Sequence, residues 1–186
     1  HGCWFEAYFA WFNMADVPPA LIYQTQSNPL SDDYFVQQRK RYGTSLVHLS
    51  SYEKMKSYQQ ALTEGRALIV SLDQSYTNNG VKVTFFDRQF PCAKGSAILH
   101  LRTKAPVLTS VYYMKDNQLH IDFDTVELPE YTEINDENIL DISQRAIKKY
   151  EDFISSYPEQ WFSLFHRLWS KKDYPPVKRS LLDIFF

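Results

Sequence analysis

The chain has 186 residues, of which 44% are hydrophobic and 23% charged. This length and composition are typical of one globular domain with a well-filled core and argue against two domains. The formal net charge of −2 gives no reason to expect nucleic-acid binding. No apolar run approaches the roughly 18 to 20 residues that span a bilayer, so any membrane attachment would be peripheral or supplied by sequence outside this chain.

The first half of the chain alternates predicted helices and strands. Residues 2–14 are apolar on almost every side, which predicts a helix that is buried or in contact with lipid. Val17-Pro18-Pro19 ends it. The elements expected next are a strand over 20–25, a helix from Ser31 or Asp32 to about Tyr42 ended by Gly43, a strand over 45–49, and a helix from Ser50 or Ser51 to Glu64 ended by Gly65.

An unbroken apolar run over residues 67–72 is the strongest strand signal in the chain. Such a run is typical of a parallel strand that is covered on both faces. Asp73, Gln74 and Ser75 follow it directly, at the end of a strand where ligands bind in open α/β sheets. Hydrogen bonds to neighbouring loops are the alternative role for Asp73 and Gln74.

The second half of the chain predicts a hairpin flanked by helices. The elements expected are a turn, a short strand and a loop over 78–90, a helix over 92–104, strands over 106–114 and 118–126 joined by a hairpin turn at 115–117, a helix over about 136–156, and a short aromatic segment over 157–169. This order predicts an α/β sandwich with helices on both faces of a mostly parallel sheet and an antiparallel hairpin at its edge.

Several familiar catalytic motifs are missing from the sequence. It has no Walker A or G-x-G-x-x-G loop, no G-x-S-x-G elbow and no H-E-x-x-H. Cys3 and Cys92 match no metal-ligand spacing, and we interpret them as reduced, buried thiols.

The remaining enzyme-like feature is the pair His1 and Glu6, five positions apart at the start of the apolar helix. The helix dipole disfavours imidazolium just before the helix, which keeps His1 available as a base, and favours a carboxylate in the opening turns. A His and a carboxylate without a nucleophile of their own would activate a substrate hydroxyl, which is the pattern of direct acyl transfer. The alternative interpretation is a terminal His and a solvated Glu.

Four segments resemble the bacterial lipid A biosynthesis acyltransferases, the lauroyl and myristoyl transferases that act late in that pathway. The family's H-x4-E/D motif is similar to HGCWFE (1–6), and its Asn-Pro block with a later Arg and Gly is similar to NPLSDDYFVQQRKRYG (28–43). The block in which Asp-Gln closes a strand resembles LIVSLDQSYTNNGVKVTFF (68–86), and the C-terminal block resembles YPEQWFSLFHRLW (157–169). The resemblance runs in the family's order from residue 1 to about 170.

The resemblance implies a fold and a domain organisation. It implies a glycerolphosphate-acyltransferase-like α/β sandwich, with a catalytic domain over residues 1–170 and a tail over 171–186. The transmembrane part that precedes the motif in the family is absent, and the sequence begins with His1 rather than Met, so we expect a fragment.

The resemblance also implies a reaction. His1 would deprotonate a hydroxyl of a lipid A precursor, and Glu6 would orient the imidazole and stabilise its charged form. The hydroxyl would attack the thioester of an acyl carrier protein, or of coenzyme A, without a metal or a cofactor. The expected location is the cytoplasmic face of the bacterial inner membrane, with membrane association and no nucleic-acid partner.

Four further residues are candidates for substrate binding. Arg39 would stabilise the thioester oxyanion or hold a phosphate, unless it lies on a solvated helix face with its basic neighbours Lys40 and Arg41. Asp73, Gln74 and Arg167 are assigned binding roles on the same resemblance. The basic cluster at 39–41 and the basic tail would dock the acidic carrier protein.

Two departures from the family leave other functions open. Gln24 stands where the family often has Arg, and DRQFPCAKG follows Phe86 where the family commonly has Gly and then Thr. One alternative is therefore an acyltransferase of the same superfamily that acts on another glycolipid or an aminolipid. Another is a non-catalytic lipid-binding domain, against which the intact His1 and Glu6 argue. The aromatic residues after His1 would either wall an acyl groove or pack against the N-terminal part that is missing from this sequence.

Overall fold

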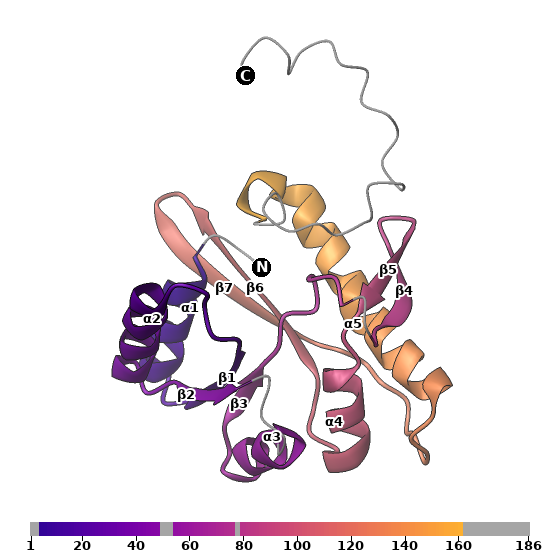
Figure 1. The fold of residues 1–186 in the computed structure, drawn as a ribbon. Helices are drawn as coiled ribbons and strands as arrows, with labels where there is room; N and C mark the ends of the chain where they lie inside the picture. The colour runs from indigo at the N-terminus through magenta and orange to yellow at the C-terminus, as the bar shows by residue number, and fades with distance from the viewer. Residues whose placement is uncertain (1–3, 49–53, 77–78, 162–186) are drawn as a thin grey trace.

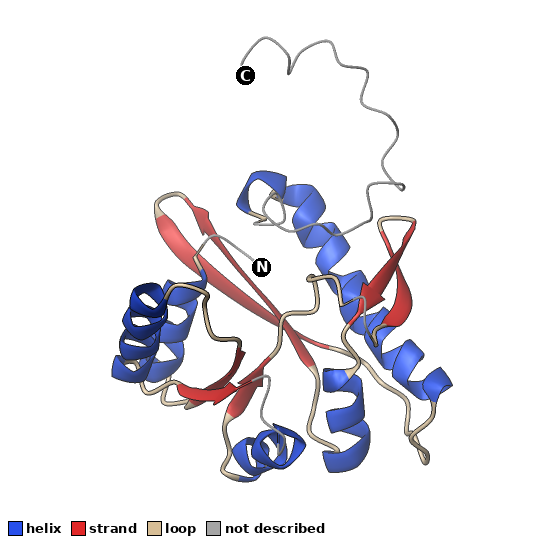
Figure 2. Ribbon diagram, in the orientation of Figure 1, coloured by secondary structure: helices blue, strands red, loops and turns tan. Residues whose placement is uncertain are grey.

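The computed structural model describes residues 4–48, 54–76 and 79–161, and the fold is of the α/β class (Figure 2). The helices are α1 (Phe5–Met14), α2 (Pro29–Arg41), α3 (Lys54–Thr63), α4 (Gly95–Thr103), α5 (Asp136–Ser156) and the 3-10 helix η1 (Pro158–Gln160). The strands are β1 (Pro19–Tyr23), β2 (Ser45–His48), β3 (Ala67–Ile69), β4 (Val81–Phe85), β5 (Arg88–Cys92), β6 (Leu108–Lys115) and β7 (Gln118–Thr125). Figure 1 shows α1 and α2 together on one side of the molecule, and α5 with the β4–β5 hairpin on the other.

The parallel sheet is small and has the strand order β2-β1-β3. Leu21 of β1 lies opposite Leu46 of β2 on one side and Ile69 of β3 on the other. The strand expected over residues 67–72 is only three residues long, and its side chains are half-buried, so the prediction of a strand covered on both faces is wrong. After Ile69 the chain leaves the ladder, and Leu72 packs instead into the core beneath the β4–β5 hairpin.

Two antiparallel hairpins complete the β structure. The pair β6–β7 confirms the predicted hairpin, with Asp116 and Asn117 at positive φ in its turn. Within the described residues, no backbone ladder joins this hairpin to the parallel sheet, so it is a separate sheet rather than the expected edge. The other hairpin corrects a prediction, because residues 88–92 form strand β5 instead of a loop.

The β4–β5 hairpin forms because its apolar side chains alternate. Val83, Phe85, Phe90 and Cys92 point to one side and are fully buried, whereas the residues between them are exposed or half-buried. The two-residue turn, Phe86 and Asp87, has positive φ at both positions, which suits a tight hairpin. After the turn the alternation resumes one residue out of phase, with Phe90 and Cys92 buried, although the polar residues Asp87 to Gln89 resemble a loop in the sequence.

Helix boundaries follow local capping chemistry. Helix α2 begins at Pro29 and not at Ser31 or Asp32, because Asn28 Oδ1 accepts hydrogen bonds from the backbone N–H groups of Leu30 and Ser31. Helix α5 confirms the prediction over 136–156 and is capped by Asn135, which accepts from Asn138 N–H. Helix α4 is shorter than expected, since Cys92 belongs to β5.

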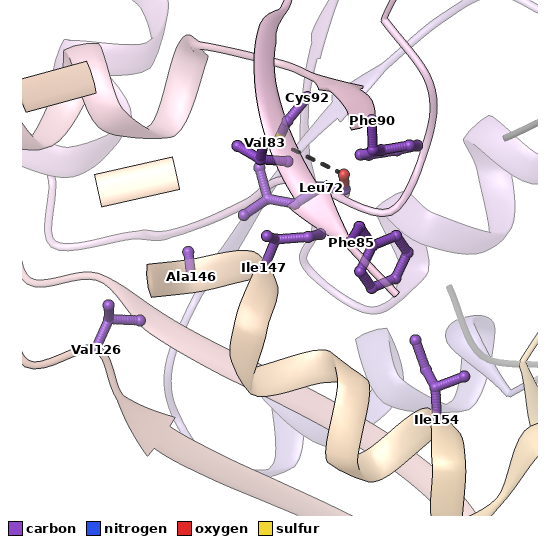
Figure 3. Close-up of a cluster of buried hydrophobic side chains, with 9 residues drawn as sticks. All are labelled: Leu72, Val83, Phe85, Phe90, Cys92, Val126, Ala146, Ile147 and Ile154. Carbon is purple, nitrogen blue, oxygen red and sulfur yellow. Dashed lines mark hydrogen bonds between the residues drawn. The ribbon is translucent and has the colours of Figure 1, made fainter. Parts of the chain in front are cut away.

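The main core lies between α5 and the β4–β5 hairpin. Figure 3 shows Ile147 and Ile154 of α5 facing the hairpin side chains Val83 and Phe85, and the Cys92 Sγ atom donates to the Leu72 carbonyl oxygen. A second cluster surrounds α1, whose buried aromatic rings pack against β1, β3 and the β6–β7 hairpin. Of the helices in the described ranges, none is both long and apolar enough to cross a membrane.

Candidate functional site

Glu6 and Arg39 form an ion pair between α1 and α2. The Arg39 Nη2 atom donates to Glu6 Oε1 at 2.7 Å. The Arg39 Nε atom lies 3.2 Å from the same oxygen and 3.4 Å from Oε2. Two nitrogens of the guanidinium thus contact the carboxylate, and charge-assisted hydrogen bonds of this kind restrain its orientation as well as its position.

Aromatic rings surround the guanidinium of Arg39. Its Cζ atom lies 5.7, 5.6 and 5.4 Å from the ring centroids of Phe5, Phe9 and Phe35. Arg39 is buried, whereas its neighbours Lys40 and Arg41 are exposed, so the interpretation of Arg39 as part of a solvated face is wrong. Cation–π attraction to these rings stabilises the buried guanidinium, and the attraction is stronger where water is excluded.

The Glu6 side chain is partly exposed. It is 33% exposed, compared with 11% for Arg39. Oε1 accepts the two shorter bonds from Arg39, and Oε2 has, among the described residues, only the long contact with Arg39 Nε. The interpretation of Glu6 as merely solvated therefore fails, and the carboxylate is able to accept a further hydrogen bond from a donor such as an imidazole N–H. His1, the expected donor, lies outside the described residues.

Asp73 lies elsewhere, at the end of the segment that follows β3. It is 5% exposed and accepts a hydrogen bond at 2.9 Å from Trp161 Nε1. Gln74 beside it is half-buried. Arg167 lies outside the described residues. The structure therefore brings Glu6 and Arg39 together, and it ties Asp73 to the segment after α5, as the predicted loop role implied.

A small cavity of about 20 Å³ opens beside Asp73, between β6, α5 and Trp161. Ser110 lines it and also meets Tyr8 of α1, whose hydroxyl lies 2.6 Å from Ser110 Oγ. Tyr8 stacks on Tyr112, with ring centroids 4.6 Å apart. Burial raises the pKa of Tyr8 to about 12, although the hydrogen bond with Ser110 opposes this rise. Tyr8 thus connects the helix that carries Glu6 to the cavity beside Asp73.

A larger cavity of about 110 Å³ lies next to it, between the β3 segment, β6, α3, α4 and α5. Tyr150 lines both cavities, and its burial raises the pKa of its phenol. Neither cavity is lined by residues of α1, whose buried aromatic side chains pack against β1, β3 and the β6–β7 hairpin. Packing of the α1 rings against a missing N-terminal part stays a prediction.

Several residues of this region escaped sequence reasoning. Tyr8, Tyr150 and Trp161 sit in aromatic-rich segments, where nothing in the sequence distinguishes them from core residues. Trp161 lies in the C-terminal segment that resembles the family. Its hydrogen bond with Asp73 is not predictable from the sequence, because the two residues are 88 positions apart. No group of three or more His, Cys, Asp or Glu side chains placed to hold a metal occurs in the described part of the chain.

Comparison with known proteins identifies the family. The family profile described as bacterial lipid A biosynthesis acyltransferase matches residues 1–171, which is nearly the whole chain. A search of curated proteins found none that matches. The profile spans the Glu6–Arg39 pair, Asp73 and both cavities, and the chain therefore belongs to the bacterial lipid A biosynthesis acyltransferase family.

Proposed function

We propose that this protein transfers a fatty acyl chain from the thioester of an acyl carrier protein to a hydroxyl of a lipid A precursor, at the cytoplasmic face of the bacterial inner membrane. Family membership supports acyl transfer from a donor to a lipid acceptor. The observation that supports the role given to Glu6 is its ion pair with Arg39, in which Glu6 Oε1 accepts the two shorter hydrogen bonds.

In this mechanism His1 is the general base and Glu6 its orienting partner. His1 takes the proton of the acceptor hydroxyl, whose oxygen attacks the thioester carbonyl carbon and forms the new C–O bond. The C–S bond then breaks, and the departing thiolate receives the proton from the imidazolium. Glu6 stabilises the imidazolium through Oε2 while Oε1 stays bound to Arg39.

Arg39 acts in this mechanism as a positioning residue. Its Nε and Nη2 atoms are both engaged by Glu6, so the geometry favours fixing the carboxylate over the oxyanion or phosphate contact expected from the sequence. A carboxylate held in this way needs no reorganisation when the imidazole becomes charged. Loss of the Arg39–Glu6 ion pair is expected to lower kcat more than it raises KM, because in this mechanism Arg39 acts through Glu6 and not on the substrate.

The test is acyl transfer from acyl carrier protein to a lipid A precursor, measured with His1→Ala, Glu6→Gln and Arg39→Met. We expect at least about a hundredfold loss for His1→Ala, the usual scale for a general base. Arg39→Met is expected to lower kcat by about tenfold or more with little change in KM, and Arg39→Lys is expected to recover part of this loss.

The exposed pair Glu64 and Arg66, with Arg66 Nε 3.1 Å from Glu64 Oε2, provides matched controls. Glu64→Gln and Arg66→Met are expected to leave transfer unchanged. Full activity of the folded His1→Ala variant would refute the mechanism. Product formed on another glycolipid or an aminolipid, and not on the lipid A precursor, would refute the proposed acceptor.

A further inference from the structure

Helix α1 lies against both α2 and the β6–β7 hairpin, and each neighbour contacts a different face of it. Glu6 and Phe9 contact Arg39 of α2, whereas Tyr8 stacks on Tyr112 of β6 with ring centroids 4.6 Å apart. Consecutive residues of an α-helix are about 100° apart around its axis, so Tyr8 lies roughly 200° from Glu6. The two side chains therefore hold nearly opposite faces of the same helix.

The contact of Tyr8 with the hairpin is directional. Tyr8 is 4% exposed, and its phenol oxygen lies 2.6 Å from Ser110 Oγ. Phe9 and Phe12 also pack α1 against its neighbours, but hydrophobic contact is non-directional. A hydrogen bond weakens steeply when its geometry departs from the ideal. On this face of α1, the bond between Tyr8 and Ser110 is therefore the contact that best fixes the rotation of the helix about its own axis.

Ser110 is itself held from two sides. Its strand pairs with β7, where Ser110 lies opposite Phe123. Its backbone also forms a hydrogen bond with the phenol of Tyr150 on α5, a helix of the main core. Ser110 thus connects the main core to the helix that carries Glu6, through the hairpin that runs between them (Figure 1).

A small rotation of α1 is enough to disrupt the ion pair of Glu6. Side-chain ends lie roughly 5–6 Å from the axis of an α-helix, so a rotation of about 20° displaces them by about 2 Å. Arg39 Nη2 and Nε lie 2.7 and 3.2 Å from Glu6 Oε1. An increase of about 2 Å in these distances would break both hydrogen bonds. A contact that fixes the rotation of α1 therefore also fixes the orientation of the Glu6 carboxylate.

We propose that the Tyr8 hydroxyl is a positioning group for acyl transfer, because its bond to Ser110 holds α1 in the rotation that keeps Glu6 paired with Arg39. The inference rests on the proposed function for the role of Glu6. Tyr8 acts through Glu6 and does not touch the reacting atoms, so loss of its hydroxyl lowers kcat and leaves KM nearly unchanged. A hydroxyl that only satisfied a buried partner would affect stability and not the ion pair.

The first test observes the ion pair directly and needs no acyl transfer. In the NMR spectrum of the intact chain labelled with nitrogen-15, the Arg39 Nε–H signal is assigned by its loss in Arg39→Met. We expect its hydrogen to exchange with solvent about fivefold faster in Tyr8→Phe and in Ser110→Ala, because the ion pair then opens more often. Ser110→Thr keeps the hydroxyl, and the cavity of about 20 Å³ beside it has room for the added methyl group, so exchange should be unchanged.

The second test is acyl transfer from acyl carrier protein to a lipid A precursor. Tyr8→Phe and Ser110→Ala are each expected to lower kcat by about fivefold, with KM within about twofold of its original value. The double variant should lose no more than either single variant, since both changes remove the same hydrogen bond. Ser110→Thr is expected to keep the original kcat.

Tyr113 provides the matched control. It lies on the same hairpin, its hydroxyl donates to Asp122 Oδ2 at 3.0 Å, and its ring contacts Phe153 of α5. Tyr113→Phe therefore removes a phenol hydrogen bond on the side of the hairpin that faces α5. We expect it to leave both the Arg39 hydrogen exchange and kcat unchanged.

Three outcomes would overturn the proposal. They are unchanged Arg39 hydrogen exchange in the Tyr8 and Ser110 variants, an equal acceleration in Tyr113→Phe, and faster exchange without any loss of kcat. Ser110→Ala decides the question if Tyr8→Phe does not fold. If the unmodified protein transfers no acyl chain to the lipid A precursor, the proposed function fails, and the Arg39 exchange still shows whether Tyr8 positions Glu6.

Discussion

Two buried or half-buried carboxylates, on opposite sides of the molecule, show how similar groups serve different purposes. Glu6 on α1 is held by a guanidinium from another helix and keeps one oxygen available. Glu151 on α5 is 8% exposed, and its oxygens are taken by the backbone N–H of Phe86 and by Lys148. The contacts of Glu6 orient a carboxylate for catalysis in the proposed mechanism, whereas those of Glu151 hold the β4–β5 turn against α5. We therefore expect changes near α5 to affect stability and changes near α1 to affect activity.

The largest expected effect is on the α5 side. Phe85 is fully buried between α5 and the hairpin, so Phe85→Ala is expected to lower the free energy of unfolding by about 3–5 kcal/mol. A urea titration followed by circular dichroism measures it. Phe123, which is 41% exposed, is the control, and Phe123→Ala is expected to cost much less. Equal losses for the two would contradict the assignment of the main core.

The next largest effect is expected for the ion pair between Glu6 and Arg39, on the α1 side. Removing one partner of a fully buried ion pair costs about 3–5 kcal/mol, and the partial exposure of Glu6 reduces this to roughly 2 kcal/mol for Arg39→Met. In a double-mutant cycle, Glu6→Gln combined with Arg39→Met is expected to cost less than the sum of the single changes by about 1 kcal/mol or more. Additive losses would show that the pair does not interact in solution.

A smaller effect separates the two carboxylates. Glu151→Met keeps the side-chain volume but leaves the Phe86 N–H without its acceptor, which is expected to cost about 1–2 kcal/mol of stability. Acyl transfer measured on the folded variant should be unchanged. Glu159→Met, at an exposed position, serves as the control. If Glu151→Met lost activity without losing stability, the purely structural role assigned to Glu151 would be wrong.

The smallest effect is a dependence on alkaline pH. Burial raises the pKa of Cys92 from 9.0 to about 12, and that of Tyr8 from 10.0 to about 12. A group whose pKa is raised by folding stabilises the protein fully below its unfolded pKa, and this contribution is lost as pH rises toward the folded value. Stability should therefore begin to fall as pH approaches 9, and the loss at pH 9 should be roughly 0.5 kcal/mol.

Cys92→Ala isolates the share of the thiol. Urea titrations at a series of pH values should show the first decline shifted from about pH 9 toward pH 10, where Tyr8 begins to contribute. An unchanged curve would mean that the thiol ionises equally in the folded and unfolded chains.

The elements with strong local signals were predictable from the sequence. The β6–β7 hairpin has its turn residues at 115–117, and α5 has a long helical repeat of apolar residues, so both were placed closely. The sequence analysis did not predict strand β5, because the polar residues of the turn separate its alternating apolar residues from those of β4. The length of β3 was overestimated, since an apolar run does not reveal where a ladder ends.

The site was predictable residue by residue but not pair by pair. Glu6, Arg39 and Asp73 were chosen from motifs, yet their partners depend on contacts between residues far apart in the chain. Arg39 is 33 positions from Glu6, and its burial among aromatic rings follows from how α1 packs on α2.

The hydrogen bond between Tyr8 and Ser110 has a consequence for regulation. Ser110 lines the small cavity, and Tyr8 lies two residues after Glu6 on the same rigid helix. A ligand that pulls Ser110 away from Tyr8 would change the restraint on α1, and any tightening of α1 would in turn alter the affinity for that ligand by the same factor. If a ligand of the small cavity changes the contact between Ser110 and Tyr8, its binding is thermodynamically linked to the position of Glu6.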